Sequence, residues 1–278
     1  MSDFLEIMFR PFVACMILVA IHSYLGLHVI AREVIFVDLA LAQMAALGTT
    51  TSLLFGVART SPAAQLFAIG AVILGAAIFA ATRTKDHGRV PQEAIIGIVF
   101  VVASAAAILI ANQVPNGGEA MREILEGTIL WVTWPVIVKL AAAYVVLGAY
   151  FLVMRKRFEL ISFEPQAAEA KGWRMRWWDF WFYLGFGLVI TFSVPIAGVP
   201  LVFSFLVVPA VTAFMFTSRP APLTIIAWTT GAVASTGGLA LSYWNDWPTG
   251  PVIVCTFGLV LLGAAVVKRL LARETAAA

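Results

Sequence analysis

The sequence predicts an all-α, polytopic membrane protein with eight to nine transmembrane helices. Hydrophobic residues make up 62% of its 278 residues and charged residues only 12%, and the mean hydropathy is +0.95. A soluble domain of this length carries roughly 25% charged residues. The apolar residues gather in runs of about 17–24, long enough for a helix to cross a ~30 Å hydrocarbon core. Helices are predicted rather than barrel strands, because the runs are long and lack period-2 alternation.

Nine such runs follow one another along the chain. They are Phe12–Ile30, Val34–Val57, Ala63–Ala81, Ala94–Ala111, Trp134–Met154, Trp177–Ile196, Val199–Phe216, Pro222–Trp244 and Pro251–Val267. We expect the first to be a retained span, because Asp3 and Glu6 precede it where a signal peptide would be basic. Pro195, Pro200 and Pro209 suggest short or broken helices around the seventh run. Eight spans and a half-span are therefore an alternative.

The basic residues predict the orientation in the membrane. With nine alternating spans, 14 of the 18 lysines and arginines fall on one side, and only Arg10, Arg59, Arg122 and Lys139 fall on the other. Cytoplasmic loops carry an excess of Lys and Arg. We therefore expect a multi-pass protein of the bacterial inner membrane, with its C-terminus in the cytoplasm and its N-terminus outside.

The chain reads as a single transmembrane domain over residues 1–278, with one long hydrophilic segment at about 155–176. This segment is too short to fold alone and lies on the basic, cytoplasmic side. A short amphipathic helix is predicted from Pro165 to Lys171, ended by Gly172. The tryptophans that follow predict re-entry through the membrane interface.

A second helical pattern concerns small residues. Gly231, Ala234, Ser235 and Gly238 are spaced i, i+3, i+4, i+7 and share one helix face. Such a face allows two helices to approach closely. We favour ordinary packing inside the chain over a special contact as its explanation.

The motifs of common enzymes are absent from the sequence. It contains no glycine loop followed by Lys-Ser/Thr for nucleotide binding, no hydrolase motif and no Cys–His cluster. Cys15 and Cys255 lie in apolar runs as packing residues. We expect no enzymatic activity in this chain and no nucleic-acid partner.

The polar residues inside the predicted spans are the candidates for function, because a charge in hydrocarbon is costly. Asp38, Gln43 and His22 are the candidates for an ion pathway or gate. Asp38 and Gln43 are about 140° apart around a helix, so an ion site must combine different helices. Structural alternatives stay open: Asp38 can complement a helix dipole, and Gln43 can bond a neighbouring helix. His22 lies deep in its run, and a packing role and a functional role are about equally expected for it.

Asp246 precedes the last span in "LSYWNDWPTGP". It is a candidate outer-side ion residue, or a helix N-cap that satisfies orphan amides.

Several phrases together resemble the permease of the zinc/manganese/iron class of metal-ion ABC importers. They are "REVIFVDLALAQMAALG" (32–48), "EAIIGIVF" (93–100), "EGTILWVT" (126–133), "FEPQAAEAKG" (163–172), "GVPLVFSFLVVPAVTAFMF" (198–216) and "GGLALSYWNDWPTGPVIV" (237–254). The phrases occur in family order and span most of the chain.

The resemblance implies a type II ABC importer-like permease. It implies a homodimer with a translocation path, a cytoplasmic ATP-binding subunit, and an extracytoplasmic metal-binding protein. ATP would be bound by the partner subunit, and a divalent metal would be the cargo, with no tightly bound cofactor. The segment with Phe163, Glu164, Pro165, Ala168 and Gly172 would couple the permease to the ATPase.

The sequence departs from the family pattern at the expected gate. The family's second span usually carries an aspartate and, four residues on, a histidine; here Gln43 takes the histidine's position and Asp38 is shifted by one. Asp38 is the candidate metal ligand. We expect zinc ahead of manganese or iron as cargo. The alternatives are a permease for another cation or a metal chelate, a non-conducting membrane scaffold or sensor, and a stand-alone secondary transporter.

Overall fold

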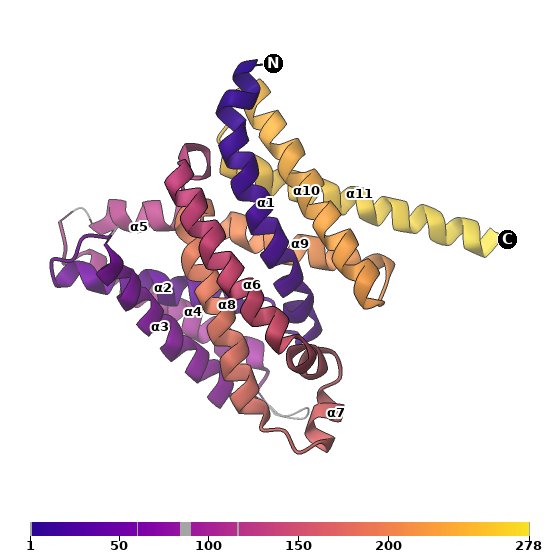
Figure 1. The fold of residues 1–278 in the computed structure, drawn as a ribbon, viewed down its shortest axis with the longest axis horizontal. Helices are drawn as coiled ribbons and strands as arrows, with labels where there is room; N and C mark the ends of the chain where they lie inside the picture. The colour runs from indigo at the N-terminus through magenta and orange to yellow at the C-terminus, as the bar shows by residue number, and fades with distance from the viewer. Residues whose placement is uncertain (1, 60, 84–89, 116, 278) are drawn as a thin grey trace. The chain divides into compact units, whose positions relative to one another are not determined.

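The computed structural model describes residues 2–59, 61–83, 90–115 and 117–277, and within these ranges all regular structure is helical (Figure 1). The elements are α1 (Ser2–Ala31), α2 (Val37–Leu54), α3 (Pro62–Ala81), α4 (Gln92–Ala111), α5 (Gly117–Glu126), the 3-10 turn η1 (Ile129–Trp131), α6 (Trp134–Phe163), α7 (Pro165–Ala170), α8 (Met175–Ala197), α9 (Val199–Phe216), α10 (Pro220–Asn245) and α11 (Thr249–Ala277). The predicted all-α fold is confirmed.

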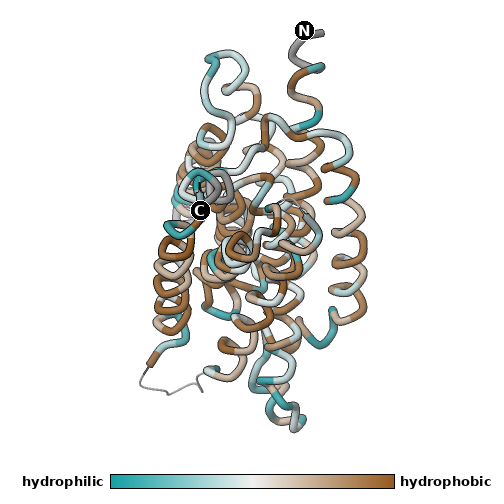
Figure 2. The backbone as a smooth tube through the Cα atoms, turned by 90° about the vertical axis from the view of Figure 1, so that its left-hand side faces the viewer, coloured by the Kyte–Doolittle hydropathy of each residue, from teal (hydrophilic) through white to brown (hydrophobic). Residues whose placement is uncertain are grey.

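Nine of the described helices are long and apolar enough to cross a membrane, namely α1–α4, α6 and α8–α11. The seventh predicted run forms a helix of its own, α9, of 18 residues. Gly198 separates α8 from α9 with a φ of +78°, a conformation that suits glycine. Pro200 is the second residue of α9. The N–H groups of the first four helical residues have no partner within the helix, so the missing N–H of proline costs no hydrogen bond there. Hydrophobic residues dominate the helices and hydrophilic ones gather near the turns (Figure 2).

The described chain divides into two compact units. Unit 1 consists of Met1–Ile30, Thr128–Ala141 and Pro200–Ala278, and unit 2 of Ala31–Gly127 and Ala142–Val199. The prediction of one permease domain over residues 1–278 stays a prediction.

In unit 2, α2 packs against α3, α4 and α8, and α3 also contacts α8. The spans differ greatly in burial. In the most apolar 18-residue stretch of each helix, 67% is buried in α2 and in α8, against 22% in α4. Large apolar side chains on α4, such as Val101 and Leu109, are exposed. In a bilayer such side chains contact lipid, so α4 is an outer helix of unit 2 and α2 an inner one.

In unit 1, the small residues of α10 contact two neighbouring helices. A Cβ added to Gly231 would lie 2.6 Å from Val19 Cγ1 of α1, and one added to Gly238 would lie 2.7 Å from Ile253 Cα of α11. The Trp228 indole N–H also donates to the Ala20 carbonyl at 2.9 Å. The predicted small-residue face is therefore a face of close helix contact.

Candidate functional site

The predicted short helix in the hydrophilic segment is present as α7. It begins at Pro165 and ends at Ala170, with Glu164 at its N-cap and Lys171 at its C-cap. Proline suits the first helical position because its fixed φ is already helical. Gly172 follows with a φ of +72°, which ends the helix as predicted.

One face of α7 is anchored to the helices on either side of it. Ala168 is fully buried in a cluster with Ile161 of α6 and Met175 of α8. Trp173 and Trp178 pack against this cluster, with ring centroids 5.7 Å apart. The side chains that leave the cluster are exposed: Phe163, Glu164, Gln166 and Glu169. The segment therefore presents a surface that is mostly polar, with one exposed aromatic side chain at Phe163, and its opposite face is anchored by Ala168.

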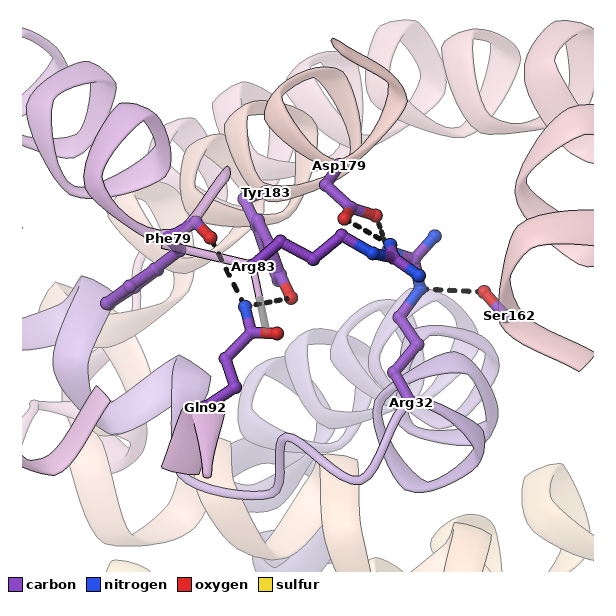
Figure 3. A network of polar contacts seen from close by, with 7 residues as sticks. All are labelled: Arg32, Phe79, Arg83, Gln92, Ser162, Asp179 and Tyr183. Atoms are coloured by element: carbon purple, nitrogen blue, oxygen red, sulfur yellow. Dashed lines mark hydrogen bonds and ion pairs between the residues drawn. The ribbon is translucent and has the colours of Figure 1, made fainter. Parts of the chain in front are cut away.

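A buried ion-pair network lies beside this segment in unit 2 (Figure 3). Arg32 Nη1 lies 2.7 Å from Asp179 Oδ1, and Arg83 pairs with the other oxygen of the same carboxylate. Arg32 Nε donates to Ser162 Oγ at 2.7 Å, and its guanidinium lies 3.8 Å from the Phe182 ring centroid. The network joins the chain after α1, the end of α6, the chain after α3 and the start of α8.

A second set of polar contacts continues from this network to α4. Gln92 Nε2 donates to the Phe79 carbonyl and to the Tyr183 hydroxyl, both at 3.2 Å (Figure 3). The first residue of α4 is thereby fixed to α3 and α8. Sequence reasoning missed Asp179, although the signal was present: it is an acidic residue within the predicted span Trp177–Ile196, where an acid is rare unless it is paired.

The inner helix α2 carries the predicted gate residues. Asp38 is the second residue of α2 and is 2% exposed, and Gln43 is 5% exposed. Asp38 Oδ1 and Gln43 Oε1 are buried without a hydrogen-bond partner in the described part of the chain. Such oxygens are costly unless water or a cation satisfies them. The place of Asp38 in the first turn also suits the helix dipole, so both interpretations stand.

Glu93 of α4 approaches the beginning of the same helix. Its Oε1 accepts a hydrogen bond from the Ile35 N–H, two residues before α2. Its Oε2 is a third buried oxygen without a partner among the described residues. No group of three or more His, Cys, Asp or Glu side chains in the described ranges has the arrangement of a metal site.

His22 lies in unit 1, whereas Asp38 and Gln43 lie in unit 2. The His22 side chain is fully buried in α1, and its Nδ1 donates to the Leu18 carbonyl at 2.9 Å. Its ring lies 6.4 Å from that of Phe205 in α9. His22 therefore packs within unit 1, and its role in an ion pathway stays a prediction.

Asp246 does not cap the last span. It is the exposed C-cap residue of α10, with a left-handed φ of +53°, and α11 begins only at Thr249. The N-cap prediction was wrong because Ser242 and Thr249 close the turn instead: their hydroxyls lie 2.9 Å apart, and Ser242 Oγ also donates to the Trp247 carbonyl at 2.8 Å. An outer-side ion role for Asp246 stays a prediction.

The sequence matches the ABC 3 transport family over residues 4–268, nearly its whole length. The chain belongs to this family. A manganese transport system membrane protein, MntC of Listeria innocua serovar 6a, is 30% identical over 72% of this chain and 71% of its own. A probable iron transport system membrane protein of Haemophilus influenzae is 30% identical over 75% of this chain and 74% of its own.

The fold of this ABC 3 transport protein also has a solved counterpart. PsaBC from Streptococcus pneumoniae, in complex with Fab, matches with a TM-score of 0.75 at 21% identity, over 95% of this chain and 94% of that one. This likeness shows that the chain has the fold of that solved structure. The family assignment confirms the resemblance found in the sequence.

Proposed function

We propose that this chain is the membrane-spanning permease subunit of an ATP-driven metal-ion importer of the bacterial inner membrane. The observation that carries the proposal is α7, a short helix with a buried base at Ala168 and an exposed polar face. Such a helix, anchored between two long spans, can dock on a soluble subunit and pass its movement to the spans. Family membership and the names of the relatives support the same reading.

The proposal includes the rest of the transport complex. A cytoplasmic ATP-binding subunit docks on the segment from Phe163 to Gly172 and binds the ATP. An extracytoplasmic metal-binding protein delivers the ion, and a second copy of this chain completes the path. The C-terminus is cytoplasmic and the N-terminus lies outside, as the distribution of basic residues favours.

The cargo is a divalent transition metal, and we place manganese ahead of zinc. The two buried candidates on α2, Asp38 and Gln43, offer oxygen atoms. Carboxylate and carbonyl oxygens suit Mn²⁺, whereas Zn²⁺ sites favour imidazole and thiolate. The names of the relatives, for manganese and iron, agree with this order. Zinc, which the family resemblance placed first, stays a candidate.

The experiment is ATP hydrolysis by the permease assembled with its ATP-binding subunit and binding protein in nanodiscs. Zinc, manganese, iron and no metal are compared. Stimulation by manganese, lost in Asp38→Asn, is the expected result. No response to any ion from an intact complex would contradict the proposal, and would favour another cargo or a non-conducting protein.

A further inference from the structure

A groove of about 1060 Å³ opens in unit 2, between the end of α3 and the chain that runs from α7 into α8. Ligand pockets in proteins typically measure ~300–1,000 Å³, so this groove is large. It is distinct from the buried oxygens of α2, since neither Asp38 nor Gln43 is among the residues that line it. It adjoins the proposed docking segment at Glu169 and Gly172, and its other lining residues have no part in the proposed transport function.

The groove combines an apolar floor with a basic rim. Ala77 and Ala81 of α3 and Phe180 of α8 belong to the apolar part of the lining, which we call the floor, and the basic part of the lining is called the rim. Arg174 and Arg176 lie at the rim, and both are exposed and form no ion pair with a described side chain.

The third arginine of the lining is already committed. Arg83 pairs with the buried Asp179, and Glu169 is the acid among the lining residues. With Arg83 set aside, two positive charges and one negative remain in the lining, a balance of +1. An anionic group at the rim would meet Arg174 and Arg176.

The position of the groove along the spans indicates its occupant. α3 ends at Ala81 and α8 begins at Met175, so the groove lies where two spans leave the hydrocarbon. Trp173 and Trp177 line it, and tryptophan favours the headgroup layer. The apolar floor on α3 and α8 thus continues toward the acyl chains, whereas the arginines face the headgroups.

We propose that this groove binds an anionic glycerophospholipid, with its phosphate on Arg174 and Arg176 and an acyl chain on the floor of Ala77, Ala81 and Phe180. Basic pockets between spans at the cytoplasmic face are typical sites for anionic headgroups. A free phosphate ion would use the rim and leave the apolar floor uncovered. A lipid would contact both the arginines of the rim and the apolar residues of the floor.

The test is native mass spectrometry of the full chain in non-ionic detergent, with phosphatidylglycerol, cardiolipin or phosphatidylcholine added at equal concentration. Each arginine near a membrane surface contributes roughly fivefold to the binding of an anionic lipid. We expect the double variant Arg174→Gln/Arg176→Gln to weaken phosphatidylglycerol binding by ~10- to 30-fold. Binding of phosphatidylcholine is expected to be weaker than that of phosphatidylglycerol from the start, and nearly unchanged in the variant.

The matched control is Lys268→Gln/Arg269→Gln, which removes two exposed cations from α11 in unit 1. It should leave phosphatidylglycerol binding unchanged. A second variant, Ala77→Phe, fills the exposed floor and leaves the arginines in place; it should lower lipid binding without moving the thermal unfolding midpoint. Equal losses in the Arg174/Arg176 and control variants, or equal binding of phosphatidylcholine, would overturn the proposal.

Discussion

Arg32 and Asp179 form an ion pair whose side chains are only 6% and 1% exposed, with 2.7 Å between Nη1 and Oδ1. The same guanidinium binds Ser162, two residues before the N-cap of α7, and Asp179 follows Met175 by one helical turn. Arg32 therefore holds together the two helices that flank α7. A movement of α7 would reach the chain that leads into α2 through this pair.

The Arg32–Asp179 pair should behave as a coupled unit in stability measurements. Breaking a buried pair by removing one partner costs about 3–5 kcal/mol, because the remaining charge is left buried. We expect Asp179→Asn to lower stability by roughly that amount, and Arg32→Gln by less because Arg83 still pairs with Asp179. The double variant should lose clearly less than the sum. The free energy of unfolding of the two single variants and the double variant, measured in detergent by circular dichroism, completes this double-mutant cycle.

The control for this cycle is Arg155→Gln. Arg155 pairs with Glu159 at 2.6 Å on an exposed stretch of α6, and such i, i+4 pairs are worth about 0.3–0.5 kcal/mol. If Asp179→Asn costs no more than Arg155→Gln, the buried network does not hold these helices together.

The anchor of α7 gives a second prediction. Ala168 is fully buried between α6 and α8, so Ala168→Leu must overpack this cluster, at a typical cost of ~1–3 kcal/mol. We expect the assembled complex to lose most of its metal-stimulated ATP hydrolysis, because the docking surface shifts. The comparison is Ala170→Leu, at an exposed position of the same helix, whose effect on the unfolding midpoint of the isolated chain should stay within about 0.5 kcal/mol. Equal midpoints for the two variants would contradict the anchoring role of Ala168.

Much of the fold could be predicted from the sequence, because a bilayer imposes strict rules on length and composition. Eight of the nine predicted runs are apolar and long enough to be recognised as spans. The seventh run is also a helix, α9, because Gly198 forms the turn between α8 and α9. Local chemistry also placed α7 within one residue of its observed end, because Pro165 and Gly172 are strong start and stop signals.

The contacts between distant residues could not be predicted in the same way. The pairing of Arg32 with Asp179 joins residues 147 positions apart, and no local pattern encodes such a partner. For Asp246 a local pattern did exist, but it was misleading. The pattern suited a helix N-cap, whereas the left-handed turn after α10 makes Asp246 the C-cap of that helix. Tertiary geometry decided both cases.

The close contact between α10 and α11 gives a third prediction, with adjacent glycines as test and control. A Cβ at Gly238 would lie 2.7 Å from the Ile253 backbone, whereas one at Gly237 meets only Thr256 Cγ2 at 3.5 Å. We expect Gly238→Ala to destabilise the chain by ~1–3 kcal/mol. Gly237→Ala should be neutral or stabilising by up to about 1 kcal/mol, because alanine is the better helix former. Thermal unfolding of the two variants in one detergent makes the comparison, and a Gly238→Ala midpoint at or above that of Gly237→Ala would rule out the tight contact.

Gln43 gives the prediction that bears most directly on the cargo. It is buried on α2, and its amide oxygen has no hydrogen-bond partner within the described ranges. Gln43→His replaces this oxygen with an imidazole nitrogen, which Zn²⁺ binds more readily than Mn²⁺ does. We expect the ratio of zinc-stimulated to manganese-stimulated ATP hydrolysis in nanodiscs to rise by about tenfold, the usual effect of 1.4 kcal/mol.

Gln43→Leu is the control, because it keeps a side chain of similar length without a ligand atom. It should lower the response to both ions and leave their ratio unchanged. A ratio that rises equally in Gln43→His and Gln43→Leu would mean that residue 43 acts through packing. A ratio that does not move in Gln43→His would mean that the ion passes without contacting this position.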